Sequence, residues 1–111
     1  MKVAVIGGRE FNDYDRLRRI LDLYPITTIV SGGAKGADSL GEKYANEKNL
    51  QKEIYHPDWD LFGKSAGFLQ NTTIIENCDM VVAFWDGASK GTKDSLDKAQ
   101  ALRKTTLIAY F

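Results

Sequence analysis

The sequence has little of what marks a secreted, membrane-spanning or polyanion-binding protein. Its 111 residues include one cysteine, Cys78, so no disulfide can form within the chain. No apolar run approaches the ~20 residues needed to cross a bilayer, and no charged-then-apolar leader opens the chain. Fifteen basic residues balance fifteen acidic ones. These features predict a cytoplasmic protein with no membrane partner, and the zero net charge disfavours a nucleic acid as partner.

Recognisable catalytic and cofactor motifs are also scarce. The single histidine, His56, has no second histidine, cysteine or paired carboxylate at ligand spacing, so we expect no metal site. GKS at residues 63–65 lacks the first glycine of a P-loop, and GGAKG at residues 32–36 lacks the spacing of a dinucleotide fingerprint. No Ser/His/Asp arrangement is recognisable. These gaps disfavour a P-loop enzyme and an NAD-dependent dehydrogenase, and leave every catalytic residue unassigned.

What the sequence does contain is a regular alternation of apolar runs and helical segments. Runs rich in β-branched and aromatic residues predict five strands, while apolar residues spaced three and four apart between them predict about four helices. Such alternation favours right-handed βαβ crossovers and a parallel sheet covered on both faces. We therefore predict an α/β fold, a single Rossmann-like three-layer domain over residues 1–111 with strand order 3-2-1-4-5. The strands are expected at residues 3–6, 26–31, 52–56, 80–85 and 106–111.

Two of the predicted helices bear on the site. A third helix is expected over residues 64–77, with Leu69 among its inward residues. A fourth is expected over residues 92–103, with Thr92 as its N-cap and Leu102 inward. Both should pack on the sheet beside the carboxyl ends of the strands.

Three glycine-bearing loops follow the first, second and fourth predicted strands. They read GGRE at residues 7–10, SGGAKG at residues 31–36 and WDGASKGT at residues 85–92. In the order 3-2-1-4-5 these strands are neighbours, so the loops should meet in one crevice. Glycine permits close approach of a ligand and lets successive N–H groups point at one anion, and a following helix N-terminus adds partial positive charge. One such loop is equally typical of a plain turn, but three together favour a phosphate site.

Charged side chains accompany these loops, and each has two interpretations. Arg9 is placed either to clamp a phosphate or to pair on the surface with Glu10 or Asp13. Asp38 suits the helix dipole but repels a phosphate, so it either caps its helix or binds ribose hydroxyls. Asp86 either accepts from a ribose or caps its turn.

The segment HPDWDLFGKSAGF, residues 56–68, carries three aromatic residues just before the third predicted helix. A loop of this size that keeps Trp59 and Phe62 is able to fold over the crevice and stack on a base. Packing against the core is the commoner role of such aromatic residues. Both interpretations of Trp59 are open at this level.

Four blocks, VIGGREFND, VSGGAKGAD, DWDLFGKSAGFLQN and DGASKGT, resemble in order and spacing the YspA-like proteins of the SLOG superfamily, across essentially the whole chain. The resemblance implies a compact Rossmann-like domain for a nucleotide or nucleotide-derived ligand, of a kind common in phages and bacteria. Relatives with this fold include cytokinin-activating phosphoribohydrolases, molybdenum-cofactor carriers and DNA-uptake processing proteins. The implied ligand contacts are Gly7, Gly8, Arg9, Ser31, Gly32, Gly33, Gly36, Asp38, Gly87, Ser89, Gly91 and Thr92, to which we add Trp59, Asn71 and Asp86.

The chain departs from these relatives at two positions. The phosphoribohydrolase motif P-G-G-x-G-T-x-x-E has its glutamate where this chain has Ser95, and Asp94 faces about 100° away on the helix. YspA-like sequences usually carry arginine before the helix asparagine, where this chain has Gln70 before Asn71. The first change argues against glycosidic cleavage, and the second removes one phosphate partner.

The residues and the resemblance together predict a protein that binds, senses or sequesters a nucleotide-type small molecule, with no firm cofactor and no assigned enzymatic activity. One alternative is a nucleoside-phosphate N-glycosidase with Asp38, Asp86 or Glu10 as acid or base. Another is a DNA-binding accessory domain, for which the basic rim residues are Arg9, Lys35, Lys64 and Lys90. The sheet edges are compatible with a homo-oligomer.

Overall fold

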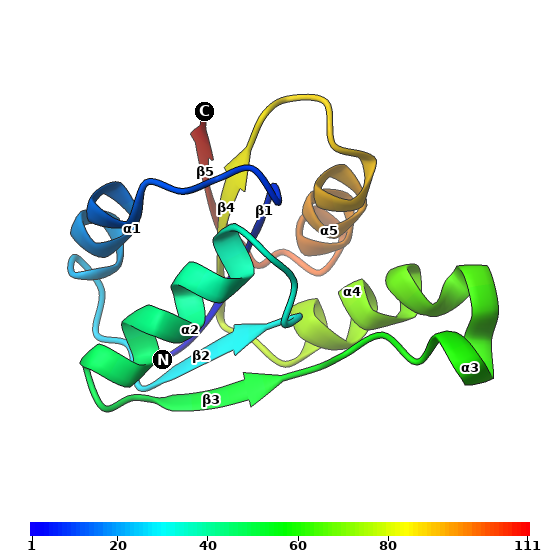
Figure 1. The fold of residues 1–111 in the computed structure, drawn as a ribbon, viewed down its shortest axis with the longest axis horizontal. Coiled ribbons are helices and arrows are strands. Elements are labelled where there is room, and N and C mark those ends of the chain that lie inside the picture. The colour runs from blue at the N-terminus through cyan, green and yellow to red at the C-terminus, as the bar shows by residue number, and fades with distance from the viewer.

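The computed structural model describes all residues 1–111 and contains one five-stranded, fully parallel sheet with helices on both faces (Figure 1). The sheet order is β3-β2-β1-β4-β5, and every neighbouring pair is parallel. The predicted α/β class, pairing and strand order are confirmed. The strands are β1 (Lys2–Gly7), β2 (Thr28–Ser31), β3 (Gln51–Ile54), β4 (Met80–Trp85) and β5 (Thr105–Tyr110).

The helices divide between the two faces of the sheet. They are α1 (Tyr14–Leu21), α2 (Ala37–Glu47), the one-turn α3 (Trp59–Phe62), a 3₁₀ turn (Gly63–Ser65), α4 (Ala66–Glu76) and α5 (Lys90–Ala101). In Figure 1, α1 and α2 lie together on one side of the sheet, and α4 and α5 lie on the other. None of these helices has the length and apolar character needed to span a membrane.

Two apolar cores lie on opposite faces of the sheet. Val3 and Val5 of β1 pack toward α1 and α2, while Ala4 and Ile6 pack toward α4 and α5. Since both faces of β1 are covered, the strand is apolar at four successive positions, Val3 to Ile6, rather than at alternate ones. A leucine such as Leu17, which is fully buried, stabilises the fold by about 1.5–3 kcal/mol through this burial.

Helix α5 begins earlier than predicted. Its N-cap is Ser89 rather than Thr92, and the Ser89 Oγ accepts from the Thr92 backbone N–H at 3.5 Å. Thr92 lies inside the first turn, where its hydroxyl donates to the same oxygen at 3.3 Å. Both serine and threonine are favoured N-caps, and no apolar residue at positions 90 or 91 reveals the earlier start. The helix also ends earlier than predicted, at Ala101, and Leu102 is its exposed C-cap rather than an inward residue.

Helix α4 differs from the prediction at Leu69. Leu69 is exposed, while Ile74 and Ile75 are buried against the sheet. Leu69 lies roughly 120° to 140° around the helix from either isoleucine, so it cannot reach the same core. Before α4, the Asp58 carboxylate caps α3 by accepting from the Leu61 backbone N–H at 3.0 Å. The segment that leads into α4 therefore carries a short helix of its own.

Candidate functional site

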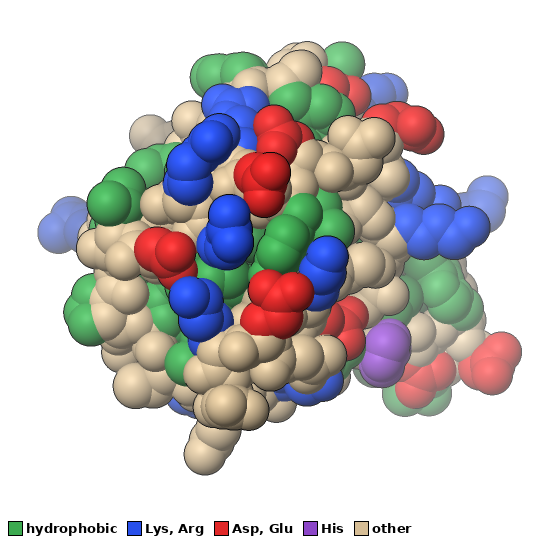
Figure 2. Space-filling view, turned by 60° about the vertical axis from the view of Figure 1, so that its left-hand side comes forward, with side chains coloured by type: hydrophobic (Ala, Val, Ile, Leu, Met, Phe, Trp, Pro, Cys, Tyr) green, Lys and Arg blue, Asp and Glu red, His purple; other side chains and the backbone are tan.

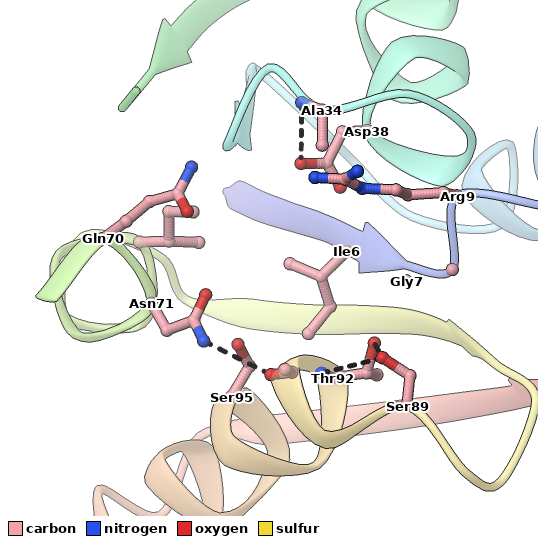
Figure 3. A pocket seen from close by; sticks show the side chains of 13 residues that line it. Ile6, Gly7, Arg9, Ala34, Asp38, Gln70, Asn71, Ser89, Thr92 and Ser95 are labelled. Carbon is pink, nitrogen blue, oxygen red and sulfur yellow. Dashed lines mark hydrogen bonds between the residues drawn. The ribbon is translucent and has the colours of Figure 1, made fainter. Parts of the chain in front are cut away.

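A pocket of about 250 Å³ opens at the carboxyl end of β1, where the direction of winding of the sheet reverses. In Figure 3, Ser89, Thr92 and Ser95 of the α5 region form one wall, Ala34, Asp38 and Arg9 form the opposite wall, and Gln70 and Asn71 lie at one end. The loops after β1, β2 and β4 thus meet at one place, as the strand order requires. We call this the inner pocket; its lining is Ile6, Gly7, Gly8, Arg9, Ala34, Asp38, Gln70, Asn71, Ile74, Ser89, Gly91, Thr92 and Ser95.

A second pocket, of about 440 Å³, adjoins the inner one and extends toward α3. We call it the outer pocket, and the two together the crevice. The pockets share Arg9, Ala34, Gln70, Asn71 and Gly91. The outer pocket is completed by Gly32, Gly33, His56, Pro57, Trp59, Lys64, Gly67 and Phe68.

The N-terminus of α5 supplies hydrogen-bond donors to the inner pocket. The backbone N–H groups of Lys90 and Gly91 donate to no acceptor within the protein. The Ser95 hydroxyl, on the next turn, also forms no hydrogen bond with the protein and lines the pocket. The amides carry the partial positive charge of the helix end, so this wall of the pocket is suited to an anion.

The Asp38 carboxylate stabilises the loop after β2 by accepting hydrogen bonds from its backbone. Its Oδ2 accepts from the backbone N–H of Gly32 at 3.2 Å and of Ala34 at 3.3 Å, so it caps the loop rather than its own helix. The residue is only 8% exposed. Burial raises the pKa of Asp38 to about 6, although the two amide hydrogen bonds act in the opposite direction. The amide of Gly32, a residue proposed from the sequence as a ligand contact, and that of Ala34 are therefore already bonded to a carboxylate.

Asp86 makes a similar pair of hydrogen bonds with the opposite electrostatic result. Its Oδ1 accepts from the backbone N–H groups of Ala88 and Ser89, both at 2.8 Å. Because this side chain is exposed, those bonds lower the pKa of Asp86 below its usual range. Asp86 lines neither pocket, and the structure places it as the cap of its turn, beside Gly87, which has a φ of +83°.

Arg9 lines both pockets and has no ion-pair partner or hydrogen bond in the protein. It does not pair with Glu10 or Asp13, and Asp13 instead caps α1 by accepting from the Arg16 backbone N–H at 3.1 Å. In Figure 3 the Arg9 guanidinium extends toward Asp38, and its charge favours ionisation of that carboxyl. Arg9 is thus an uncommitted cation at the junction of the two pockets.

Two further residues of the glycine loops lie outside the crevice. Ser31 is fully buried, and its Oγ accepts from the Gly33 backbone N–H at 3.4 Å. Gly36 has a φ of +78°, and a Cβ at this position would lie 2.3 Å from the Gly8 carbonyl oxygen. Both residues position the loop rather than line the cavity. Of the fifteen residues named from the sequence, Ser31, Gly36, Asp86 and Gly87 line neither pocket.

Two adjacent side chains of α4 join the walls of the crevice. The Gln70 Nε2 donates to the carbonyl oxygens of Gly32 at 2.9 Å and Tyr55 at 2.8 Å. The Asn71 Nδ2 donates to the Gly91 carbonyl at 3.3 Å and to the Asp94 carboxylate at 3.1 Å. Gln70 therefore connects α4 with the loop after β2 by a hydrogen bond, and Asn71 connects α4 with α5.

Sequence reasoning missed several lining residues. Ser95 and Gln70 were recognised only as departures from relatives, although both line the inner pocket. Phe68 was not named as a contact, and Lys64 was named only as a basic rim residue. They stand three and seven residues before Asn71, a spacing that places all three on one side of a helical segment. That spacing was the available signal for the outer pocket.

Charge is distributed differently over the outer surface and the crevice. Figure 2 shows Lys and Arg side chains interspersed with Asp and Glu on the face turned forward from the left side of Figure 1, where α1 and α2 lie. That face carries no patch of one sign. The crevice, by contrast, is lined by the cations Arg9 and Lys64 and by the single carboxylate of Asp38.

Comparisons with known proteins agree with this geometry. The family described as "YspA, cpYpsA-related SLOG family" matches residues 1–62. The Gene 61 protein of Mycobacterium phage D29 is 32% identical over 110 residues, which cover 89% of this chain and 88% of that protein. A structure of DNA processing protein A from Helicobacter pylori, solved for its unique single-stranded DNA binding mode, matches with a TM-score of 0.69 at 23% identity. That match covers 97% of this chain and 64% of the other chain, and at this identity it is a likeness of fold.

The comparison with DNA processing protein A corrects one prediction. A protein with this fold binds single-stranded DNA, so the argument from zero net charge that a nucleic acid is disfavoured as partner was wrong. Net charge averages over the whole surface, whereas binding depends on the local potential. In this chain the local cations stand in the crevice, away from the mixed surface of α1 and α2.

Proposed function

This chain belongs to the YspA, cpYpsA-related SLOG family, and from this membership and the geometry of the crevice we propose that it binds a nucleotide through a phosphate in the inner pocket. One observation carries the proposal. Gly91, whose backbone amide at the start of α5 is unbonded, and Arg9, whose guanidinium is unpaired, both line the inner pocket. A phosphate oxyanion satisfies both kinds of donor.

The wall formed by α5 supplies groups that we propose bind the phosphate of the ligand. The free amide of Gly91, which lines the pocket, combines with the partial positive charge of the helix end, equivalent to roughly half an elementary charge. The Ser95 hydroxyl adds a donor with no partner in the protein. Hydrogen bonds to a charged group contribute about 1.5–3 kcal/mol each, so a few of them are sufficient for micromolar binding.

The chemistry of the pocket favours binding over turnover. Asp38 is the single carboxylate that lines it, and the amides of Gly32 and Ala34 already hold one of its oxygens. Where phosphoribohydrolases carry a glutamate, α5 presents the hydroxyl of Ser95. Asp94, the neighbouring carboxylate, is bonded instead to Asn71 and to Lys98 at 2.6 Å. We therefore propose a binding or sensing protein.

A thermal-shift titration with AMP, ADP and inorganic phosphate tests the proposal. A ligand at a hundred times its Kd adds about 2.7 kcal/mol of stability, which corresponds to a rise of about 10 °C in Tm for a domain of this size. Arg9→Ala should reduce the shift. Arg19→Ala, which removes another exposed arginine without an ion pair from the outer side of α1, should leave it unchanged. The absence of a shift with every phosphate compound tested overturns the proposal.

Single-stranded DNA is a second candidate ligand. Two observations favour it: the likeness of fold to a protein that binds single-stranded DNA, and the presence of Lys64 with two exposed aromatic rings in the outer pocket. Anisotropy of a labelled oligo(dT) at several salt concentrations tests it. The logarithm of the affinity should fall with the logarithm of salt concentration with a slope of about −0.7 per phosphate contacted. Lack of binding at low salt removes this candidate.

A further inference from the structure

We infer that the outer pocket is a nucleobase-stacking subsite, in which the indole of Trp59 and the ring of Phe68 hold the base of a ligand whose phosphate lies in the inner pocket. The inference rests on the proposed function and specifies the part of the ligand beyond the phosphate. It identifies the ligand as one that carries an intact base, bound at two places in one crevice.

Volume gives the first reason. The inner pocket, at about 250 Å³, is smaller than the roughly 300–1,000 Å³ typical of small-molecule sites. The outer pocket offers about 440 Å³ and shares Arg9, Asn71 and Gly91 with the inner one. A ligand anchored at α5 that is larger than a sugar phosphate must therefore extend into the outer pocket.

The exposure of two aromatic rings gives the second reason. Trp59 is 57% exposed and Phe68 is 54% exposed, although both line the outer pocket. Core packing, the commoner role expected for Trp59, is therefore not the role that the structure gives it. Each ring keeps apolar surface in contact with water, and a flat base covers such surface well.

The two rings are held in place before any ligand arrives. A Cβ added to Gly67 would lie 3.7 Å from the Cη2 atom of Trp59, which puts the indole alongside the α4 backbone next to Phe68. The Lys98 ammonium donates to the Phe68 carbonyl oxygen at 2.8 Å and lies 5.7 Å from the centroid of the Phe68 ring. Lys98 also pairs with Asp94, which binds Asn71 of the inner pocket. Lys98 and Asp94 therefore connect the backbone of Phe68 with Asn71 of the inner pocket.

The other exposed apolar side chains nearby differ from these two in position. Leu61, 69% exposed on the same short helix as Trp59, lines none of the pockets. Phe62 lines a separate pocket of about 280 Å³ that faces Ile54 and Thr73. Leu61 is therefore a matched control for Trp59, because its removal changes α3 to a similar degree without changing the crevice.

The experiment compares ligands with and without a base. Affinities of AMP and ribose 5-phosphate are measured by calorimetry for the wild type, Trp59→Ala, Trp59→Phe and Leu61→Ala. Stacking on one aromatic ring is worth about 5- to 150-fold in affinity. Trp59→Ala should weaken AMP binding by a factor in this range and leave ribose 5-phosphate unchanged. Trp59→Phe should restore much of the loss, and Leu61→Ala should change neither affinity. AMP should quench the tryptophan fluorescence of the wild type but not that of Trp59→Phe, in which Trp85 is the sole tryptophan.

Each outcome separates the inference from the proposed function. If AMP and ribose 5-phosphate bind equally well and Trp59→Ala alters neither, the stacking subsite is refuted while phosphate binding stands. If no phosphate compound binds, the proposed function is refuted, and the stacking subsite, which rests on it, is refuted as well. A comparison of dTMP with oligo(dT) identifies the source of the base: equal Trp59-dependent affinities indicate a free nucleotide, and much tighter Trp59-dependent binding of the oligomer indicates single-stranded DNA.

Discussion

Replacing Asp38 by asparagine tests how the inner pocket is held together. Asp38 is buried beneath the loop after β2, and its Oδ2 accepts from the amides of Gly32 and Ala34. An asparagine Oδ1 can accept from the same amides, so the loop keeps its cap. What the substitution removes is the buried negative charge together with its attraction to Arg9.

The magnitude follows from the pKa of Asp38. Burial raises it from 3.8 to about 6 in the folded protein. Since the folded state binds this proton more tightly than the unfolded state, the stabilisation is fully present below pH 3.8 and is lost as the pH rises through 6. A shift of one pKa unit corresponds to about 1.36 kcal/mol, so the wild type should lose on the order of 3 kcal/mol across this window. Asp38→Asn has no proton to lose here.

Urea denaturation monitored by circular dichroism between pH 4 and pH 8 measures the effect. The free energy of unfolding of Asp38→Asn, minus that of the wild type, should increase by about 2.5 kcal/mol from pH 4 to pH 7. The subtraction cancels the contributions of the other titrating groups. A difference that stays constant across this range refutes the assignment of a raised pKa to Asp38.

Asp86 provides a control with the opposite sign. It too accepts from two backbone amides, but it is exposed and its pKa is lowered. Its ionised form therefore stabilises the fold above pH 3.8, and this contribution is lost as the pH falls. Relative to the wild type, Asp86→Asn should become less stable as the pH rises out of the acid range, whereas Asp38→Asn should become more stable.

Three further predictions concern the crevice and the core. A Cβ at Gly91 meets no atom within 4 Å, so Gly91→Val should keep the wild-type Tm while its side chain fills the junction of the two pockets. AMP binding measured by calorimetry should weaken at least tenfold, and an unchanged affinity contradicts the assignment of Gly91 to the ligand path. Gly36→Ala places a Cβ 2.3 Å from the Gly8 carbonyl oxygen at a φ of +78°, and should destabilise the protein by more than about 1 kcal/mol in urea; a wild-type midpoint contradicts the close approach. A bound phosphate disfavours the ionised form of Asp38, so the affinity for ribose 5-phosphate should rise as the pH falls through 6, after correction for ionisation of the ligand. In Asp38→Asn the affinity should not depend on pH in this way.

The fold was predictable because its signals are local and repeated. Strand periodicity, helix spacing and intervening turns each agree with a parallel α/β sheet, and the topology then places three loops at one edge. The position of the crevice followed from strand order alone. The start of α5 at Ser89 was predicted less accurately, because neighbouring residues compete as caps. The burial of Leu69 was also mispredicted, because the buried side of α4 depends on how the helix packs.

The roles of individual loop residues were not predictable in the same way. Three glycines after β2 suggested a row of amides free to hold an anion, yet Asp38 accepts from the amide of one of them, Gly32, and from that of Ala34. The same residue types are compatible with a free cradle or an internally capped loop, and the choice depends on where a side chain six residues away folds back. At the start of α5, by contrast, the Gly91 amide is unbonded, and Gly91 lines the inner pocket.

The sequence by itself determined the layered α/β architecture, the strand order and the edge of the sheet at which the crevice lies, because these depend on patterns repeated along the chain. Only the tertiary structure decided which amides stay unbonded, why Asp38 and Asp86 titrate in opposite directions, and that Trp59 and Phe68 stand exposed beside one pocket. These properties depend on distances between residues far apart in the chain and on how much water each group retains. Such quantities exist only once the chain has folded.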